Sequence, residues 1–236
     1  MNIAVIYGTG RKENSTTYHL AQRVIKKLKG DDKVFEFFLP KDMDQFCVGC
    51  YKCIEGSPEK CLAYDQIKPI REAFMKSELI IFTVPVYVFH APGQVKALLD
   101  HFAWEWMVHQ LNGVMLRKQA LIISTAAGAG MKSTIKDVKD SMDFWGVGRV
   151  YTYSKAIFAA NWVEIKEEER AKMEAKILQI SKRIKKREGD VTPRLKVKLM
   201  FYGCRFMHKK MGLNAVDLEH WKKNGWLGKV RPWKMS

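Results

Sequence analysis

Four cysteines stand close together in the chain and have the side chains for redox or metal chemistry. They are Cys47, Cys50, Cys53 and Cys61, in the spacing C-x2-C-x2-C-x7-C, while a fifth, Cys204, stands far away. Thiolates at this spacing can converge on an iron-sulfur cluster, with the last ligand returned by a loop. Reduced thiols, a zinc ion or a disulfide fit the same residues. The spacing alone leaves these alternatives open.

A second group of polar side chains lies in "GTGRKENSTT", residues 8–17, directly after the apolar run "NIAVIY". Glu13 breaks the G-x-G-x-x-G dinucleotide pattern, and the G-K-[ST] ending of a Walker loop is missing. Hydroxyls, an arginine and the start of a helix suit a terminal phosphate, although ordinary N-capping would use some of the same residues. The candidate phosphate ligands are Thr9, Arg11, Asn14, Ser15, Thr16 and Thr17.

Apolar runs alternate with amphipathic segments along the first two-thirds of the chain. Strands are predicted at residues 2–7, 33–39, 78–85, 119–125 and 149–159, the third of them stopping at Pro85. Helices are predicted at residues 16–29, 66–76, 93–104 and 131–146. Strands joined by helical crossovers indicate a doubly wound α/β fold with five parallel strands. In such folds ligands bind beyond the carboxyl ends of the strands, so the loops starting at residues 8, 85 and 125 should form one site.

Three of these segments together resemble the flavodoxin-like family of NAD(P)H-dependent FMN reductases. They are "GTGRKENST", "PVYVFHAPGQVKALLDHF" and "STAAGAG", and the likeness covers residues 1–160. Gly10 departs from the pattern, because the family often has proline there. The resemblance implies a flavodoxin-like fold, an FMN cofactor and NAD(P)H as co-substrate. Hydride would pass through the flavin to a quinone, a flavin or a similar small acceptor.

The resemblance also assigns residues to the two parts of FMN. The phosphate falls on the polar loop named above, and the isoalloxazine ring falls between two later loops. Apolar side chains would form a flat wall for the ring, while glycines would allow close backbone approach. No catalytic side chain is expected, because the flavin carries the chemistry. The implied ring-binding residues are Pro85, Val86, Tyr87, Val88, Phe89, Thr125, Ala126, Ala127, Gly128 and Gly130.

The cysteine motif resembles a second group with the same fold, the iron-sulfur flavoproteins, which carry a [4Fe-4S] cluster near FMN. Similar cysteines are also found in FMN reductases that hold no cluster. An alternative function is therefore an electron carrier with a cluster on the four clustered cysteines.

The last third of the chain is strongly basic and is predicted to be a helical extension, residues 161–236, added to a flavodoxin-like domain of residues 1–160. Residues 176–212 contain 12 basic and 2 acidic side chains, and the chain carries a net charge of +16. Two apolar stripes are predicted on its helices: Met173, Ile177, Ile180 and Ile184 on the first, and Leu195, Leu199, Tyr202 and Phe206 on the second.

An apolar stripe of this kind can dock on the flavodoxin-like domain, on a second subunit or on an anionic membrane surface. Nucleic acid is disfavoured, because no known binding module is present. A non-enzymatic membrane-surface or regulatory module is the third functional alternative. The sequence shows no secretory leader and no run long enough to span a bilayer, so we expect a cytoplasmic protein. The family resemblance implies a homodimer.

Overall fold

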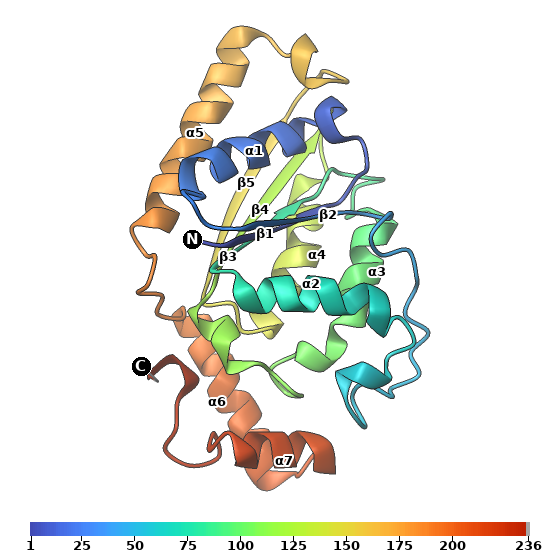
Figure 1. Cartoon of the computed structure of the whole chain (residues 1–236), viewed down its shortest axis with the longest axis vertical. Helices are drawn as coiled ribbons and strands as arrows, with labels where there is room; N and C mark the ends of the chain where they lie inside the picture. The colour runs from blue at the N-terminus through green and yellow to red at the C-terminus, as the bar shows by residue number, and fades with distance from the viewer. Residues whose placement is uncertain (235–236) are drawn as a thin grey trace.

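Five parallel strands form one sheet in the computed structural model, which describes residues 1–234 (Figure 1). Their order is β2-β1-β3-β4-β5, which is the flavodoxin-like order predicted from the sequence. The strands are β1 (Ile3–Tyr7), β2 (Val34–Phe38), β3 (Leu79–Thr83), β4 (Gln119–Ala126) and β5 (Arg149–Ala156). Strand β3 ends at Thr83, just before the predicted stop at Pro85, which cannot donate a hydrogen bond to a neighbouring strand.

Helices cover both faces of the sheet, so alternate residues of β1 belong to different cores. Ile3 and Val5 face α1 (Thr16–Leu28) and α5 (Glu167–Lys185). Ala4 and Ile6 face the other core, which α2 (Tyr64–Lys76), α3 (Gly93–His101) and α4 (Met131–Phe144) complete. This double coverage explains why the strands read as continuous apolar runs.

The first helix of the basic region, α5, packs on one face of the sheet. Figure 1 shows α5 beside α1, and its predicted stripe, Met173, Ile177, Ile180 and Ile184, is buried in the same core as α1. The prediction that this stripe docks on the flavodoxin-like fold is confirmed.

The next two helices, α6 (Leu195–Lys210) and α7 (Ala215–Lys223), extend the opposite core. They pack on residues 103–117, where the indole N–H of Trp221 donates to the carbonyl of His109 at 3.2 Å. A ring nitrogen of His208 lies 2.8 Å from the carbonyl oxygen of Val108, and buried Phe201 stacks on Trp221. The last two residues of the predicted extension, 235 and 236, lie outside the described residues.

The second predicted stripe, Leu195, Leu199, Tyr202 and Phe206, does not dock on the flavodoxin-like domain, which was one of the three alternatives for it. All four side chains are exposed, while Val197, Phe201 and His208 on the opposite side are buried. Phe201 finds aromatic partners in Trp221 and Trp226, and the backbone offers a hydrogen-bond acceptor to His208. The side of α6 with Val197, Phe201 and His208 therefore packs against the rest of the protein more favourably than the exposed side does.

A buried carboxylate joins α6 to α4. Asp143 accepts hydrogen bonds from Lys139 and Lys196, each at 2.7 Å, and from Arg194. Burial opposes the ionisation of Asp143, but these three cations outweigh it and lower the pKa of the carboxyl group. The start of α6 is therefore held by charge as well as by apolar contact.

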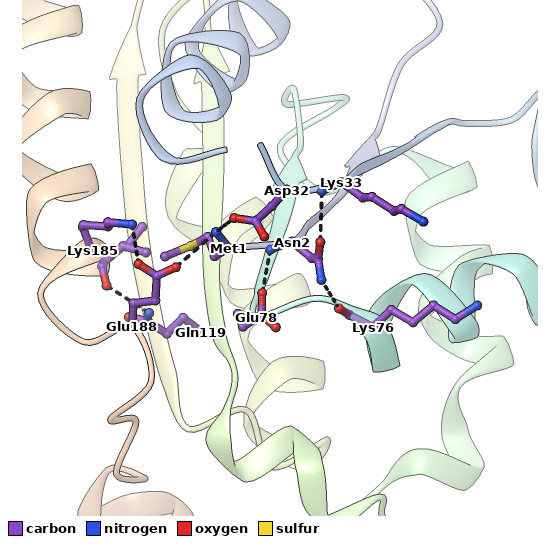
Figure 2. Close-up of polar contacts among 10 residues, drawn as sticks. Met1, Asn2, Asp32, Lys33, Lys76, Glu78, Gln119, Lys185 and Glu188 are labelled. Carbon is purple, nitrogen blue, oxygen red and sulfur yellow. Dashed lines mark hydrogen bonds and ion pairs between the residues drawn. The ribbon is translucent and has the colours of Figure 1, made fainter. Parts of the chain in front are cut away.

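Polar contacts tie the segments together at the amino-terminal edge of the sheet (Figure 2). The Asn2 side chain accepts a hydrogen bond from the Lys33 N–H at 2.9 Å and donates to the Lys76 carbonyl at 3.1 Å. The Gln119 side chain donates to the carbonyl of Ile184 at 3.0 Å, which links β4 to the end of α5. None of the helices within residues 1–234 is both long and apolar enough to cross a bilayer.

Candidate functional site

The loops after β1, β3, β4 and β5 enclose a pocket of about 220 Å³ at the carboxyl edge of the sheet. The sequence predicted that the first three of these loops would meet, and the structure brings them together. The lining residues are Thr9, Arg11, Asn14, Ser15, Thr16, Pro85, Val86, Tyr87, Thr125, Ala126, Ala127, Ile157, Ala159 and Ala160.

Gly8 sets the path of the polar loop as it leaves β1. Its N–H donates to the carbonyl of Thr83 at 2.8 Å. A Cβ atom at this position would lie 2.6 Å from that same oxygen and 2.8 Å from Val95. Only glycine lets the loop pass this close to β3, so Gly8 positions the donors that follow it.

The start of α1 points hydrogen-bond donors at the pocket. Ser15 is the N-cap residue, but its side chain does not cap the helix and instead bonds to the Thr17 hydroxyl at 3.0 Å. The first-turn N–H groups of α1 therefore receive no side-chain oxygen from their N-cap residue. N–H groups at the positive end of a helix dipole favour a phosphate, so this part of the pocket suits an anion of that kind.

Arg11 lies across the pocket from the loop after β5. Its guanidinium donates to the carbonyl of Ala160 at 2.9 Å and to the Asn161 side chain at 3.2 Å. Ile157, Ala159 and Ala160 were not predicted to line the site, because the last strand was expected to run to residue 159 and only the loops after the first, third and fourth strands were assigned to the site. The available signal was topological, since β5 also ends at the carboxyl edge of a parallel sheet.

The loop after β3 forms a tight hairpin at the mouth of the pocket. Tyr87 and His90 exchange two backbone hydrogen bonds of 3.0 Å, and both residues between them have left-handed backbones. The φ angles are 47° at Val88 and 67° at Phe89. A left-handed β-branched residue such as Val88 is strained, and such strain is concentrated at functional sites.

Contacts with the loop after β4 hold this hairpin in place. The Val86 N–H donates to the Thr125 carbonyl at 3.1 Å, and the Ser133 hydroxyl bonds to the Phe89 carbonyl. Gly130 has a φ of 93°, and a Cβ there would lie 2.6 Å from Val86. Gly130 therefore allows the two loops to approach each other, whereas a Cβ on Gly128 would meet open space.

Five predicted site residues do not line the pocket. Thr17 is fully buried beneath the polar loop, and Gly130 supports the hairpin from behind. Val88 and Phe89 project into solvent at the tip of the hairpin, and Gly128 lies in the open part of its loop. His90, the last residue of the hairpin, has its Nδ1 atom 3.3 Å from the carboxylate of Asp137.

The cysteine loop between β2 and α2 lines a separate, mainly apolar pocket of about 380 Å³. Cys47, Cys50, Cys53 and Cys61 all line it and all carry free thiols. The Cys61 sulfur lies 3.6 Å from Nδ1 of His101. Within residues 1–234, no group of three or more His, Cys, Asp or Glu side chains is arranged to hold a metal ion.

The two inner thiols of this pocket, Cys53 and Cys61, have raised pKa values. Burial raises the pKa of Cys53, and the neighbouring Cys61 raises it further. Burial also raises the pKa of Cys61, with added repulsion from Cys47 and Cys50. These raised pKa values favour the neutral thiols while no metal is bound. Within residues 1–234, the arrangement of side chains gives no support to the cluster-bearing alternative.

Comparison with known protein families bears on the first pocket. Residues 1–164 match the NADPH-dependent FMN reductase family. The chain belongs to this family. The expected oxidoreductase activity and FMN cofactor are thereby confirmed, and the non-enzymatic alternative is wrong.

Individual relatives agree with this family membership. The FMN-dependent NADH:quinone oxidoreductase of Pelagibacter ubique (strain HTCC1062) is 26% identical over 194 residues, which cover 72% of this FMN reductase and 97% of the relative. The protein of the same description from Haemophilus influenzae (strain 86-028NP) is 24% identical over 168 residues, covering 66% of this chain and 86% of the relative.

Solved structures show the same fold. An azoreductase from Bacillus anthracis str. Sterne superposes with a TM-score of 0.58 at 14% identity, covering 77% of this chain and 98% of that one. An FMN-dependent NADH-azoreductase from Bacillus anthracis str. Ames Ancestor, solved in complex with FMN, gives a TM-score of 0.55 at 10% identity over 77% of this chain and all of the other.

Proposed function

We propose that this FMN reductase family member is an NAD(P)H:quinone-type oxidoreductase whose FMN lies in the pocket of about 220 Å³. The observation that carries the proposal is the meeting of a free helix start and a strained hairpin in one pocket. The helix start suits a phosphate, and the hairpin offers an apolar surface to a flat ring.

The polar loop would hold the phosphate. The side chains of Thr9, Ser15 and Thr16 are buried hydroxyl groups at the pocket wall, so they can donate to an anion without losing further contact with water. Arg11 already reaches across the pocket and can turn its guanidinium to a phosphate oxygen. Asn14 and the first-turn N–H groups of α1 complete this set of donors.

Two other loops would hold the ring. Pro85, Val86 and Tyr87 line the pocket from one side, and Thr125 to Ala127 line it from another. The Tyr87 hydroxyl lies 3.4 Å from the Thr9 hydroxyl, which joins the ring end of the pocket to the phosphate end. When bound, FMN supplies the hydride chemistry, and the protein provides position and access.

The small acceptor is proposed to be a quinone or a similar electron-poor molecule. Two relatives are described as quinone oxidoreductases. The exposed Tyr87, Val88 and Phe89 at the mouth of the pocket would give a flat acceptor an apolar surface beside the ring site. NAD(P)H would use the same open side.

We also propose that the protein is a homodimer and that it is located in the cytoplasm. Each subunit would consist of a flavodoxin-like domain, residues 1–160, and a basic extension. Exposed Phe158 lies between the pocket residues Ile157 and Ala159, and with Val88 and Phe89 it makes an apolar rim that a second subunit could cover. Free thiols on all five cysteines support a reducing compartment.

Loss of Arg11 tests the position of the phosphate. Arg11→Ala should raise the Kd for FMN about tenfold to a hundredfold, since a hydrogen bond to a charged group contributes about 1.5–3 kcal/mol. The control is Lys27→Ala, which removes a positive charge from the exposed far end of α1. Titration of apoprotein with FMN, followed by flavin fluorescence, measures both.

Equal FMN affinity in the wild type and Arg11→Ala would show that the phosphate lies elsewhere. A rise in Kd for Lys27→Ala equal to that for Arg11→Ala would show that net charge, and not the loop, is responsible. An iron and sulfide assay on the anaerobically purified protein tests the cluster separately, and we expect flavin absorption without iron.

A further inference from the structure

Helix α6 is apolar on two opposite sides, although only one side is buried. Val197, Phe201 and His208 are buried. With 3.6 residues per turn, a second set of apolar residues lines up on the other side of the helix, and all are exposed. We call this set the outer stripe: Leu195, Leu199, Tyr202 and Phe206. A helix that served only the core would not need it.

Cations border the outer stripe on both sides. Helical geometry places Lys198 and Lys209 along one flank and Lys210 along the other. The ammonium group of Lys198 lies over the ring of Trp233, 5.8 Å from its centre, while Lys209 and Lys210 are exposed. An apolar stripe with cations along both sides is the pattern of a helix that lies in a membrane interface.

The end of the chain adds further positive charge to the same surface. Arg205 donates to the carbonyls of Trp226, Leu227 and Gly228 at 3.1, 3.0 and 2.9 Å, which fixes this segment beside α6. The guanidinium of Arg231 lies 5.1 Å from the ring centre of Tyr202 and donates to its hydroxyl at 3.2 Å. The outer stripe is therefore held on a rigid, basic surface.

We propose that the outer stripe docks on an anionic lipid bilayer. Leu199 and Phe206 would enter the acyl region, and Lys209 and Lys210 would reach the headgroup phosphates through their flexible side chains. The binding is at the surface, because α6 has 16 residues and a spanning helix needs about 20.

The charge of the surface argues against other occupants. In a symmetric dimer built on the outer stripe, the same face would meet itself, so the basic borders of two copies would repel each other. A nucleic acid would satisfy the lysines but would leave Leu199 and Phe206 against phosphate and sugar. An anionic bilayer offers phosphates to the cations and acyl chains to the outer stripe.

The location of α6 leaves the FMN pocket free. Figure 1 shows α6 and α7 at the lower end of the view, whereas the loop before α1 lies at the upper end. Docking through the outer stripe therefore does not require any residue of the pocket, and membrane binding and FMN binding can be tested independently.

Vesicle co-sedimentation of the FMN-loaded full chain tests the proposal, with phosphatidylcholine vesicles with and without phosphatidylserine. The variant is Leu199→Ser with Phe206→Ser, whose side chains are 61% and 63% exposed. The matched control is Leu62→Ser with Phe46→Ser, 65% and 71% exposed in the cysteine loop. Retained flavin absorption shows that each variant is folded.

We expect the wild type and the control to sediment with phosphatidylserine vesicles, and the outer-stripe variant to bind at least tenfold more weakly. Binding should also fall with added salt, because the cations contribute. No sedimentation of the wild type, or equal sedimentation of all three proteins, overturns the proposal. Loss of a dimer in the outer-stripe variant, without vesicle binding by the wild type, would assign the surface to a second copy. Binding of the wild type to a duplex oligonucleotide, without any binding to vesicles, would overturn the proposal in favour of nucleic acid.

Discussion

Replacing Gly130 by alanine should disturb both the stability of the protein and its affinity for FMN. Gly130 is the N-cap residue of α4 and has a φ of 93°, a backbone that side chains other than hydrogen disfavour. The added Cβ would lie 2.6 Å from a methyl group of Val86 and 2.8 Å from the Cα of Phe89. Both of these residues belong to the hairpin at the mouth of the pocket.

The backbone strain alone sets a lower limit on the effect. A left-handed backbone costs a residue with a Cβ roughly 1–2 kcal/mol. For a chain of this size, that lowers the Tm by about 2–8 °C. The contacts below 3 Å require the hairpin to move as well, because backbone atoms cannot turn aside as a flexible side chain can. We expect this movement to raise the Kd for FMN about tenfold, which corresponds to about 1.4 kcal/mol.

Thermal unfolding of the apoprotein and FMN titration measure the two effects. Gly128→Ala is the control for stability, since its Cβ would meet nothing within 4 Å and should change the Tm by little. If Gly130→Ala matched Gly128→Ala in both Tm and Kd, the contact between the two loops would not support the pocket, and our account of Gly130 would be wrong.

Two further predictions concern buried charges. Burial raises the pKa of the Glu105 carboxyl to about 8, and a hydrogen bond from Asn112 opposes this only weakly. The protonated carboxyl therefore makes its full contribution to the stability of the fold below pH 4.5, and this contribution is lost as the pH rises to 8. Glu105→Gln should therefore stabilise the protein relative to the wild type, by an amount that grows by roughly 1.4 kcal/mol per pH unit in this window. Urea unfolding of both proteins at pH 5 and pH 8 measures this, and an equal difference in unfolding free energy at the two pH values would contradict the prediction. Asp143 has a lowered pKa, so its contribution is present above its ordinary pKa of 3.8 and is lost as the pH falls through the lowered value. Asp143→Asn should cost about 2 kcal/mol at pH 7 and expose the start of α6 to protease, whereas Asp140→Asn, which breaks an exposed pair with Lys136, should do neither.

Most of the sheet could be predicted from the sequence because its strands are buried on both faces. A run such as "NIAVIY" is almost entirely apolar, which is typical of a strand covered on both faces. The crossover helices have one apolar stripe each, so strands and helices can be told apart by their patterns. The loops that meet at the carboxyl edge follow from the strand order without any side-chain detail. The loops after the first, third and fourth strands were identified in this way, whereas the family resemblance assigned the individual ring-binding residues within them.

The sequence was less informative where a segment has more than one suitable face. On α6, Leu195 and Leu199 form a stripe as regular as that of Val197 and Phe201, so periodicity cannot decide which is buried. The decision depends on Trp221 and Trp226, which lie later in the chain and supply the aromatic partners of Phe201. Such a choice is made by tertiary contacts, which a local pattern does not contain.

The hairpin at residues 87–90 is a different case, because its sequence argues against its conformation. Neither Val88 nor Phe89 favours a positive φ, and each residue held there costs on the order of 1–3 kcal/mol. The surrounding contacts offset this cost: Asp137 accepts a hydrogen bond from the Ala91 N–H at 3.2 Å, and Ser133 bonds to the Phe89 carbonyl. A glycine at either position would relieve the strain but would remove an exposed apolar side chain from the mouth of the pocket. The conformation is therefore understandable if these side chains serve the bound ring, its acceptor or a second subunit, which is the role that we propose for the hairpin.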